Sequence, residues 1–400
     1  MKKIIYCAVA TFLLFASCTT TTPKENLPDG DEILSIIDKV NVKWQTEHTL
    51  LPADSLPFRP YSNNSPFWDN AAYHTGNMEA YKLTSKAEYL AYSKAWAESN
   101  LYMGATSTDT TEWQYHYGET PKHVLFGDWQ ICFQTYCDLY NLEPDANKIA
   151  RAREVMEYEM STPNNDYWWW ADGLYMVMPV MTKLYCITGN EQYLDKLYEY
   201  WSFAKDLMYD NKEMIGDTLV NEPKFLFFRD GKYVYPKHVS ANGVKDFWAR
   251  GCGWVVAGLA KILQDIPANC KYRDEFLSTY CEMAAAVKDC QQAEGYWTRS
   301  LLDPEHAPGP ETSGTAFFTY GLLWGINNGI LDREAYLPTA LKAWEYLTQT
   351  ALQEDGRVGY VQPIGERAIP GQVVDINSTS NFGVGAFLLA SCEMYRLVTK

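Results

Sequence analysis

The sequence predicts an all-α protein, an (α/α)6 barrel in which six helical hairpins close into a ring. Two observations carry this prediction. Short loops rich in Gly, Pro, Asn and Asp alternate with amphipathic stretches, and a similar charged helix start recurs along the chain. Between the charged helices lie stretches rich in aromatic and small residues, which is typical of buried helices. An open solenoid is the alternative, but its hairpins would be more uniform in length.

The expected helices alternate between charged and apolar ones. The charged helix starts lie at residues 85–90, 190–194, 273–277 and 332–337. The twelve expected helices span residues 32–46, 67–84, 86–101, 124–140, 146–160, 168–188, 191–207, 244–265, 272–291, 312–328, 333–349 and 381–398. The fourth, sixth, eighth, tenth and twelfth of them carry few charges, so we expect these five helices in the inner ring.

One connection between the expected helices is much longer than the others. It runs from Tyr209 to Val244 and contains residues 224–235, KFLFFRDGKYVY. This segment predicts a small β-hairpin insertion with its turn at Asp230-Gly231. Insertions into a ring of helices usually lie at the end that carries the functional site, so we expect this one near a ligand.

The first residues predict export. Residues 1–3 are basic at two positions, residues 4–15 are apolar over the length of a signal peptide, and small residues directly precede Cys18. This pattern resembles a bacterial lipobox, which predicts a lipoprotein signal peptide over residues 1–18 with Cys18 as the lipidated residue. Ordinary signal cleavage near Ala16 is the alternative, and it would leave Cys18 unexplained.

The rest of the chain divides into two parts. Residues 19–31 are polar and rich in Thr, which predicts a tether, and residues 32–400 form a single (α/α)6 domain. We therefore expect an outer-membrane-anchored lipoprotein that faces the periplasm or the cell surface. It would contact the membrane only through its lipid.

Composition narrows the class of ligand. Asp and Glu outnumber Lys and Arg by 50 to 34, and the net charge of −16 argues against nucleic acid as a partner. The 14 Trp, 29 Tyr and 16 Phe residues favour a sugar ligand, because aromatic rings stack on pyranoses; for most of these rings, an aromatic-rich core is the alternative. The cysteines and histidines show no spacing typical of a metal site.

Two carboxylates stand out at the starts of apolar helices. In residues 167–176, YWWWADGLYM, Asp172 lies among aromatic rings, where loss of hydration raises a carboxyl pKa into the range of a general acid. Asp128 occupies the equivalent early position in the preceding apolar helix. Because consecutive inner helices are neighbours, the two groups can face one cavity and do acid and base work on a sugar. The alternative for each is a structural role at a helix start.

The next apolar helix begins with a cluster of aromatic and basic residues. In residues 247–254, FWARGCGW, Trp248 and Trp254 bracket Arg250. The guanidinium fork of Arg250 matches a carboxylate, although pairing with an acid of the same chain is the commoner use. His238 ends the long connection just before this cluster and is a potential donor near the mouth of the ring.

A fourth helix start carries hydroxyl groups. In residues 311–316, ETSGTA, Thr312 and Ser313 stand at the beginning of an apolar helix. Their hydroxyls either bind a ligand or cap the helix, and capping is the simpler interpretation.

Taken in order, these motifs resemble those of glycoside hydrolase family 105, and the resemblance covers most of residues 60–400. The matching motifs are HTGNM at 74–78, DWQ at 128–130, WWWADGLYM at 168–176, FWARGCGW at 247–254 and ETSGTA at 311–316. That family comprises unsaturated rhamnogalacturonyl hydrolases and is related to the family 88 unsaturated glucuronyl hydrolases. The resemblance implies an (α/α)6 barrel, in agreement with the independent count of helices.

The resemblance also implies a reaction and a set of site residues. It implies an exo-acting hydrolase that removes a 4,5-unsaturated uronic acid, galacturonyl or glucuronyl, from the non-reducing end of lyase-generated oligosaccharides such as those from pectin, by hydrating the C4=C5 bond. Asp172 matches the proton donor, and Asp128 matches the second carboxylate, which positions substrate or keeps Asp172 protonated. The residues expected to bind substrate are His74, Trp170, His238, Trp248, Arg250, Trp254, Thr312 and Ser313. No metal or organic cofactor is expected. Cys252 departs from the family, which often has Asn there.

Two other functions remain open at this point. An inverting glycosidase or a lyase of another (α/α)6 family would use the same two carboxylates on a saturated substrate. A surface glycan-binding lipoprotein without catalysis is the alternative of a different class. It has little need of two acids buried at helix starts.

Overall fold

The computed structural model describes residues 27–51, 62–211, 214–215, 218–219 and 222–400. The expected signal peptide, Cys18 and most of the expected tether lie outside the described residues. The division at residues 18 and 31 therefore stays a prediction.

All twelve predicted helices are present in the described part of the chain. They are α1 (Gly30–Glu47), α2 (Trp68–Thr84), α3 (Ala87–Ser99), α4 (Cys132–Leu142), α5 (Asn147–Ser161), α6 (Ala171–Thr188), α7 (Gln192–Met208), α8 (Ala249–Asp265), α9 (Arg273–Asp289), α10 (Thr312–Asn327), α11 (Arg333–Tyr346) and α12 (Asn381–Thr399). Short 3-10 turns lie at Thr110–Glu112 and Gly127–Trp129, and one π-helical turn, Leu347–Ala351, follows α11.

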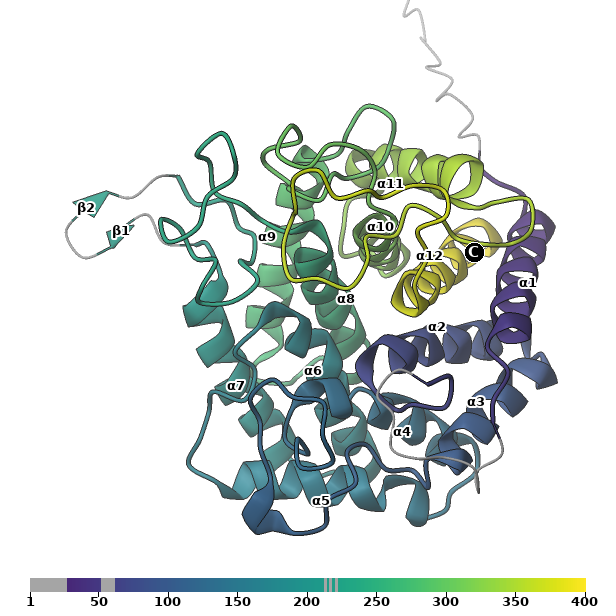
Figure 1. Ribbon diagram of the computed structural model, residues 1–400, viewed down its shortest axis with the longest axis vertical. Coiled ribbons are helices and arrows are strands. Elements are labelled where there is room, and N and C mark those ends of the chain that lie inside the picture. Colours follow the sequence, from purple (N-terminus) through teal and green to yellow (C-terminus); the bar gives the residue numbers. More distant parts are fainter. Residues whose placement is uncertain (1–26, 52–61, 212–213, 216–217, 220–221) are drawn as a thin grey trace, which may run out of the picture.

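The helices form two concentric rings (Figure 1). Helices α2, α4, α6, α8, α10 and α12 pack side by side as the inner ring, and α12 packs against α2 to close it. Helices α3, α5, α7, α9 and α11 each pack outside the inner helix that precedes them, and α1 packs on α12. The (α/α)6 barrel is therefore confirmed, as is the assignment of the five predicted inner helices.

The inner helices are buried nearly all round, because their sequences offer apolar or small side chains on every face. In α10 every residue from Thr312 to Ile326 is buried. Helices α2 and α12 touch through backbone, since a Cβ added at Gly76 would lie 2.3 Å from the carbonyl oxygen of Gly385. Helix α12 is also long and apolar enough to cross a membrane, but 78% of the relevant window is buried inside the barrel, as expected of a core helix.

Three inner helices begin later than the sequence predicts. Helix α4 begins at residue 132 rather than 124, α6 at 171 rather than 168, and α8 at 249 rather than 244. In α6 and α8 the first amides pair with another segment: Ala171 N donates to Arg229 O (2.8 Å), and Ala249 N donates to Arg299 O (2.9 Å). The residues before these helices therefore run as extended loops.

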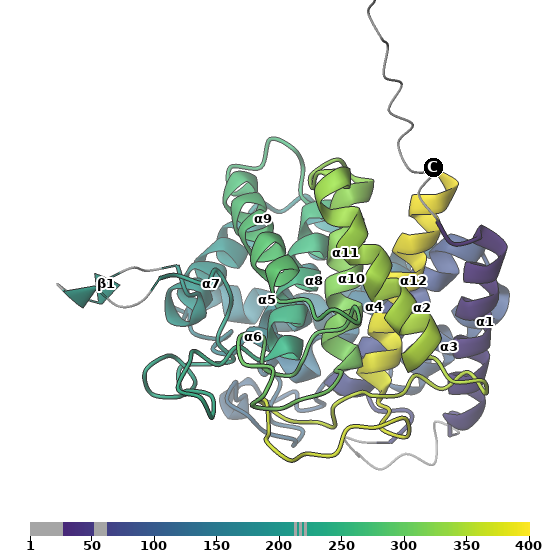
Figure 2. The ribbon, with the colours of Figure 1, turned by 90° about the horizontal axis from the view of Figure 1, so that it is seen from above.

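The long connection between α7 and α8 contains a hairpin, but not where the sequence predicts it. Strand β1 (Met214–Ile215) pairs antiparallel with β2 (Thr218–Leu219), whereas residues 224–235 form only isolated bridges to other segments. The prediction of a turn that pairs the two halves of 224–235 is wrong because Asp230 pairs instead with Trp170, at the start of α6. The connection and the loop that follows α11 lie at the same end of the barrel (Figure 2).

Candidate active site

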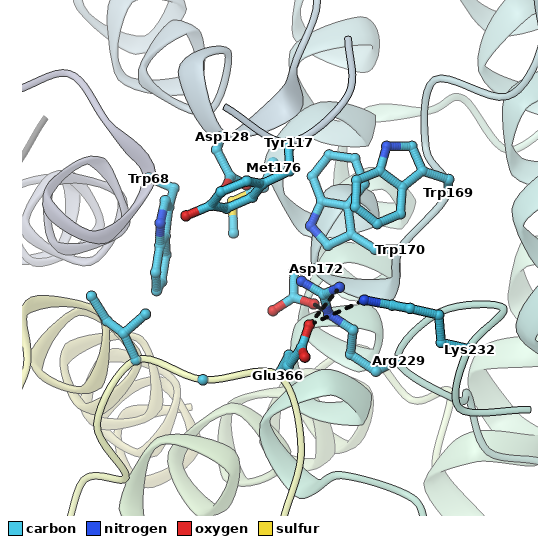
Figure 3. A pocket seen from close by; sticks show the side chains of 12 residues that line it. Trp68, Tyr117, Asp128, Trp169, Trp170, Asp172, Met176, Arg229, Lys232 and Glu366 are labelled. Carbon is cyan, nitrogen blue, oxygen red and sulfur yellow. Dashed lines mark hydrogen bonds and ion pairs between the residues drawn. The ribbon is translucent and has the colours of Figure 1, made fainter. Parts of the chain in front are cut away.

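A cavity of about 410 Å³ opens at the end of the barrel where α6 begins. It is lined by Trp68, Tyr117, Asp128, Trp169, Trp170, Asp172, Met176, Arg229, Lys232, Ile364, Gly365 and Glu366. These residues come from five places: the start of α2, the segment that leads from α3 into α4, the start of α6, the connection between α7 and α8, and the loop that follows α11. Both predicted carboxylates and one predicted tryptophan, Trp170, therefore face one space (Figure 3).

Asp172 lies in the first turn of α6 and is only 9% exposed. Burial raises its pKa above the usual value, while the positive charge of Arg229 opposes that shift. The Oδ2 atom of Asp172 is buried and has no hydrogen-bond partner within the described residues. A raised pKa favours the protonated form of a carboxyl group, which is the form that can donate a proton.

Asp128 lies in the 3-10 turn that precedes α4 and is 7% exposed. Its pKa is raised well above the usual value, first by burial and then by the negative charge of Asp172. The charge of Asp172 thus makes ionisation of Asp128 harder, so the two groups resist losing both protons. Such a pair is suited to acid and base work in one cavity.

The indole of Trp170 fixes the spacing of these two acids. It packs between the segments that carry them, because Gly127 and Gly173 present no side chain to it. A Cβ added at Gly127 would lie 3.1 Å from the Trp170 ring, and one added at Gly173 would lie 3.2 Å from it. The ring of Phe126 lies against the same indole, with 4.9 Å between centroids. Both acids thus stand on one rigid aromatic support.

A buried amide and a buried acid support the turn that carries Asp128. Gln130 Nε2 donates to Val124 O (3.1 Å) and to Glu159 Oε1 on α5. Burial raises the pKa of Glu159 to about 8, and the hydrogen bond from Gln130 opposes the shift. Glu159 is therefore a neutral acid at pH 7. Its Oε2 atom has no partner within the described residues.

The long connection places a cation beside Asp172. Arg229 Nε lies 3.6 Å from Asp172 Oδ2, and Nη1 donates to Asp230 Oδ2 at 2.7 Å. The same Nη1 lies 3.6 Å from Glu366 Oε2, which also pairs with Lys232 Nζ at 3.4 Å. Figure 3 shows this cluster on one side of the cavity and Trp68 across from it.

Arg250 and Trp248, which the sequence predicts as ligands of the substrate, do not line this cavity. The guanidinium of Arg250 lies between the rings of Trp248 and Phe382, 4.5 and 4.6 Å from their centroids. Its Nη1 and Nη2 atoms donate to the carbonyls of Gln362 (2.7 Å) and Pro363 (2.9 Å). Trp248 Nε1 donates to the side chain of Gln362 at 2.8 Å. The two residues therefore hold the loop that leads to the cavity wall.

Trp254 is likewise outside the cavity lining. It is fully buried against Tyr175 and Phe317, with centroid distances of 4.8 and 4.3 Å. Its ring meets that of Trp68, which does line the cavity, edge to face at 6.3 Å. Trp254 thus backs the wall instead of forming it.

The predicted histidines and hydroxyls also serve the protein interior. His74 is fully buried, stacks on Trp96 at 3.8 Å, and its pKa is lowered well below the usual value by burial. His238 Nε2 pairs with Asp246 at 2.9 Å. The remaining two are Thr312, which shares a hydrogen bond with Tyr346 OH, and Ser313, which donates to the helix-capping carboxylate of Glu311. None of these four groups lines the cavity.

Sequence reasoning missed several cavity residues. Arg229, Lys232 and Glu366 lie in loops without periodicity, so no pattern marks them. The sequence did offer a way to predict Arg229, because this cation lies in the long connection that we expected near a ligand. No group of three or more His, Cys, Asp and Glu side chains in the described ranges could hold a metal ion.

Comparison with known proteins gives consistent similarities. A family model described as Glycosyl Hydrolase Family 88 matches residues 36–398. An unsaturated 3S-rhamnoglycuronyl hydrolase of Formosa agariphila is 32% identical over 372 residues, which cover 89% of each chain. A protein of the same name from Alteromonas sp. is 30% identical over 360 residues, covering 84% of this chain and 79% of that one.

Solved structures of similar proteins share the fold of this chain. One described as a polysaccharide lyase is 63% identical with a TM-score of 0.85, and the match covers 93% of this chain and 98% of that one. A glycosyl hydrolase family 88 protein from Bacteroides vulgatus is 55% identical with a TM-score of 0.85, over 92% and 99% of the two chains. A possible family 105 member from Salmonella enterica, 18% identical with a TM-score of 0.72 over 97% and 100% of the chains, shares the fold.

Proposed function

This chain belongs to glycosyl hydrolase family 88, and we propose that it removes a 4,5-unsaturated uronic acid from the non-reducing end of oligosaccharides. The observation that carries this proposal is the pair Asp172 and Asp128, two buried acids with raised pKa values that face one cavity. Hydration of a C4=C5 bond begins with protonation of a carbon atom. It therefore needs an acid that is still protonated near neutral pH.

The reaction assigns one step to each acid. Asp172 gives its proton to C4, and a water molecule adds its oxygen to C5. Asp128, or Asp172 after its own proton has left, accepts the proton that the water releases. The product is a hemiketal at C5. Its ring opens by breaking the bond between C5 and the ring oxygen, which leaves a hemiacetal at C1, and this hemiacetal releases the next sugar as an alcohol. One water is consumed in total.

A further question is which sugar the unsaturated uronic acid is linked to in the substrate. The two relatives from Formosa agariphila and Alteromonas sp. carry names that include a rhamnoglycuronyl group. We therefore propose rhamnose as the residue released, as in oligosaccharides made from rhamnogalacturonan. A panel of lyase-generated disaccharides that differ in the second sugar, at equal concentration, tests this choice through relative kcat/KM values.

A lyase is the second candidate, because the structure that is 63% identical is described as a polysaccharide lyase. A lyase removes a proton from C5 of a saturated uronate and creates the double bond that the proposed hydrolase destroys. The two activities change the absorbance at 235 nm in opposite directions. A rise with a saturated polysaccharide supports the lyase, and a fall with an unsaturated disaccharide supports the hydrolase.

The deciding experiment replaces the proposed acid. Asp172→Asn keeps the shape of the side chain but has no proton to give, so we expect kcat to fall by about 10²–10⁴-fold. Asp303→Asn is the matched control, because Asp303 is also a buried aspartate, 5% exposed, but lies outside the cavity lining. Circular dichroism verifies that both variants fold. An Asp172→Asn protein that clears the double bond at near the wild-type rate refutes the mechanism, and a wild-type protein that clears none supports a glycan-binding role.

Location is a separate proposal. The basic start, the apolar run and Cys18 support a lipoprotein attached to the outer membrane. Mass spectrometry of the N-terminal peptide is expected to find diacylglycerol on Cys18, and Cys18→Ser is expected to release the protein from membranes. An unmodified Cys18 in the mature protein would contradict this assignment.

A further inference from the structure

The carboxylate of a bound uronate needs a positively charged partner. Two arginines lie near the cavity, and their contacts show which of them is free to bind a ligand. Arg250 is fully buried, and two of its nitrogens are committed to the carbonyls of Gln362 and Pro363. It does not line the cavity. Moving it to a ligand would break both bonds and leave the carbonyl of the buried Gln362 unpaired, which is costly. Arg250 is therefore a positioning residue that holds the loop carrying Glu366.

Arg229, by contrast, lines the cavity, and contacts on the side away from the cavity hold it in place. Its backbone oxygen accepts a hydrogen bond from Ala171 N at the start of α6. Its Nη1 atom donates to Asp230, and Asp230 is itself fixed by the amide of Lys232 at 2.7 Å. These contacts hold the guanidinium in place through one of its nitrogens. The backbone bond also ties its position to that of Asp172, the next residue in the first turn of α6.

The Nε side of this guanidinium faces Asp172 without a hydrogen bond to it. Arg229 Nε and Asp172 Oδ2 lie 3.6 Å apart, and neither forms a hydrogen bond within the described residues. Their side chains are only 14% and 12% exposed, so water satisfies them poorly. A buried cation that lines a cavity and makes only a long ion pair there is suited to bind an anionic group of a ligand.

From this geometry we propose that the Nε and Nη2 edge of Arg229 binds the carboxylate of the terminal unsaturated uronate. This inference rests on the proposed function and deepens it by naming the residue that recognises the acidic group. A planar fork of two donors matches the two carboxylate oxygens. It also sets C5, which carries the carboxylate, and the neighbouring C4 beside Asp172.

Binding in this way changes the state of the general acid. Arg229 and Asp230 from the long connection and Arg250 from α8 act on Asp172. The other charged groups that line the same cavity are Asp128, Lys232 and Glu366. In the free protein the charge of Arg229 opposes the rise in the pKa of Asp172 that burial produces. A substrate carboxylate neutralises that charge, so Asp172 keeps its proton to a higher pH in the complex. Binding of the substrate thus favours the protonated form of Asp172, the form that the reaction needs.

The first test compares an unsaturated disaccharide with its methyl ester, which lacks the negative charge. The wild-type protein is expected to prefer the acid, and Arg229→Gln is expected to raise KM for the acid by about 10- to 100-fold while changing KM for the ester far less. The preference for the acid over the ester is therefore expected to disappear in Arg229→Gln. Lys232→Met is the matched control, because Lys232 is the other cation in the cavity lining but its side chain is 66% exposed and pairs with Glu366. This variant is expected to keep the preference.

The second test uses pH. In the wild-type protein the alkaline limb of kcat should lie at higher pH than that of kcat/KM, because kcat reports the complex and kcat/KM the free protein. In Arg229→Gln the two limbs should coincide. A variant that had merely lost structure would not show this change.

The outcomes separate the two proposals. Absence of wild-type turnover on the acid substrate overturns the proposed function and this inference with it. Wild-type turnover, together with an acid preference that survives in Arg229→Gln or is lost in Lys232→Met instead, overturns the role of Arg229 alone.

Discussion

Glu159 couples the stability of the barrel to pH. This side chain is 1% exposed, and burial raises its pKa from 4.5 to about 8. Between those two pH values the unfolded chain gives up the proton while the folded protein keeps it. Stability therefore falls as pH rises from about 4.5 to about 8, by about 1.4 kcal/mol for each pH unit. Over the interval from pH 5 to pH 8 the loss from this one group is about 3 kcal/mol.

Glu159→Gln removes the titration and keeps the acceptor oxygen that Gln130 uses. Urea unfolding at pH 5 and pH 8 is the assay, and the quantity measured is the drop in free energy of unfolding between the two. We expect this drop to be smaller in the variant by about 3 kcal/mol. Other buried acids such as Asp128 titrate in both proteins, so their effect cancels in the comparison.

Glu157→Gln on the same helix is the control. Glu157 is 44% exposed and pairs with Arg153 on the surface, so its replacement should change the pH dependence by less than about 0.5 kcal/mol. Equal pH dependence in wild type and Glu159→Gln would refute the argument. It would mean that Glu159 is ionised in the folded protein and satisfied by a partner other than Gln130.

Two further predictions concern packing. Gly76→Ala should lower the free energy of unfolding by about 2 kcal/mol or more, because its Cβ would meet the carbonyl of Gly385 at 2.3 Å; urea unfolding measures this, and Gly30→Ala, whose Cβ has ordinary contacts from 3.5 Å, should show no loss. Trp248→Phe leaves the side-chain oxygen of Gln362 without its donor and should cost about 1–2 kcal/mol in the same assay. An unchanged midpoint would contradict either prediction.

The sequence predicts the barrel well because burial follows local composition. Each helix shows in its own composition whether it is charged or apolar. The number of helices and the alternation of the two kinds were therefore enough to infer the ring. Asp128 and Asp172 could be found for a similar reason. Each stands at the start of an apolar helix, where a carboxylate is unusual, and successive inner helices are neighbours in the structure.

The rest of the cavity could not be predicted because it depends on contacts between distant loops. Arg229 reaches Asp172 through a bridge between residues 170 and 230, and the loop with Glu366 is held by Arg250 from another helix. Arg250 is instructive, because an arginine that the sequence places between two tryptophans has the chemistry of a ligand site, whereas in the structure two of its nitrogens donate to main-chain carbonyls. Only the position of its nitrogens reveals that it binds the main chain.

The contact between α2 and α12 has a consequence for how the barrel is made. These helices stand near opposite ends of the chain, and their glycine-lined seam is the last joint of the ring. Synthesis from the N-terminal side offers α2 early, but its partner α12 follows only after α3 to α11 have been made. Until then the backbone around Gly76 lacks the surface it fits. The ring thus closes only once α12 is present, and pairing across so long a stretch of chain is slow compared with forming each hairpin.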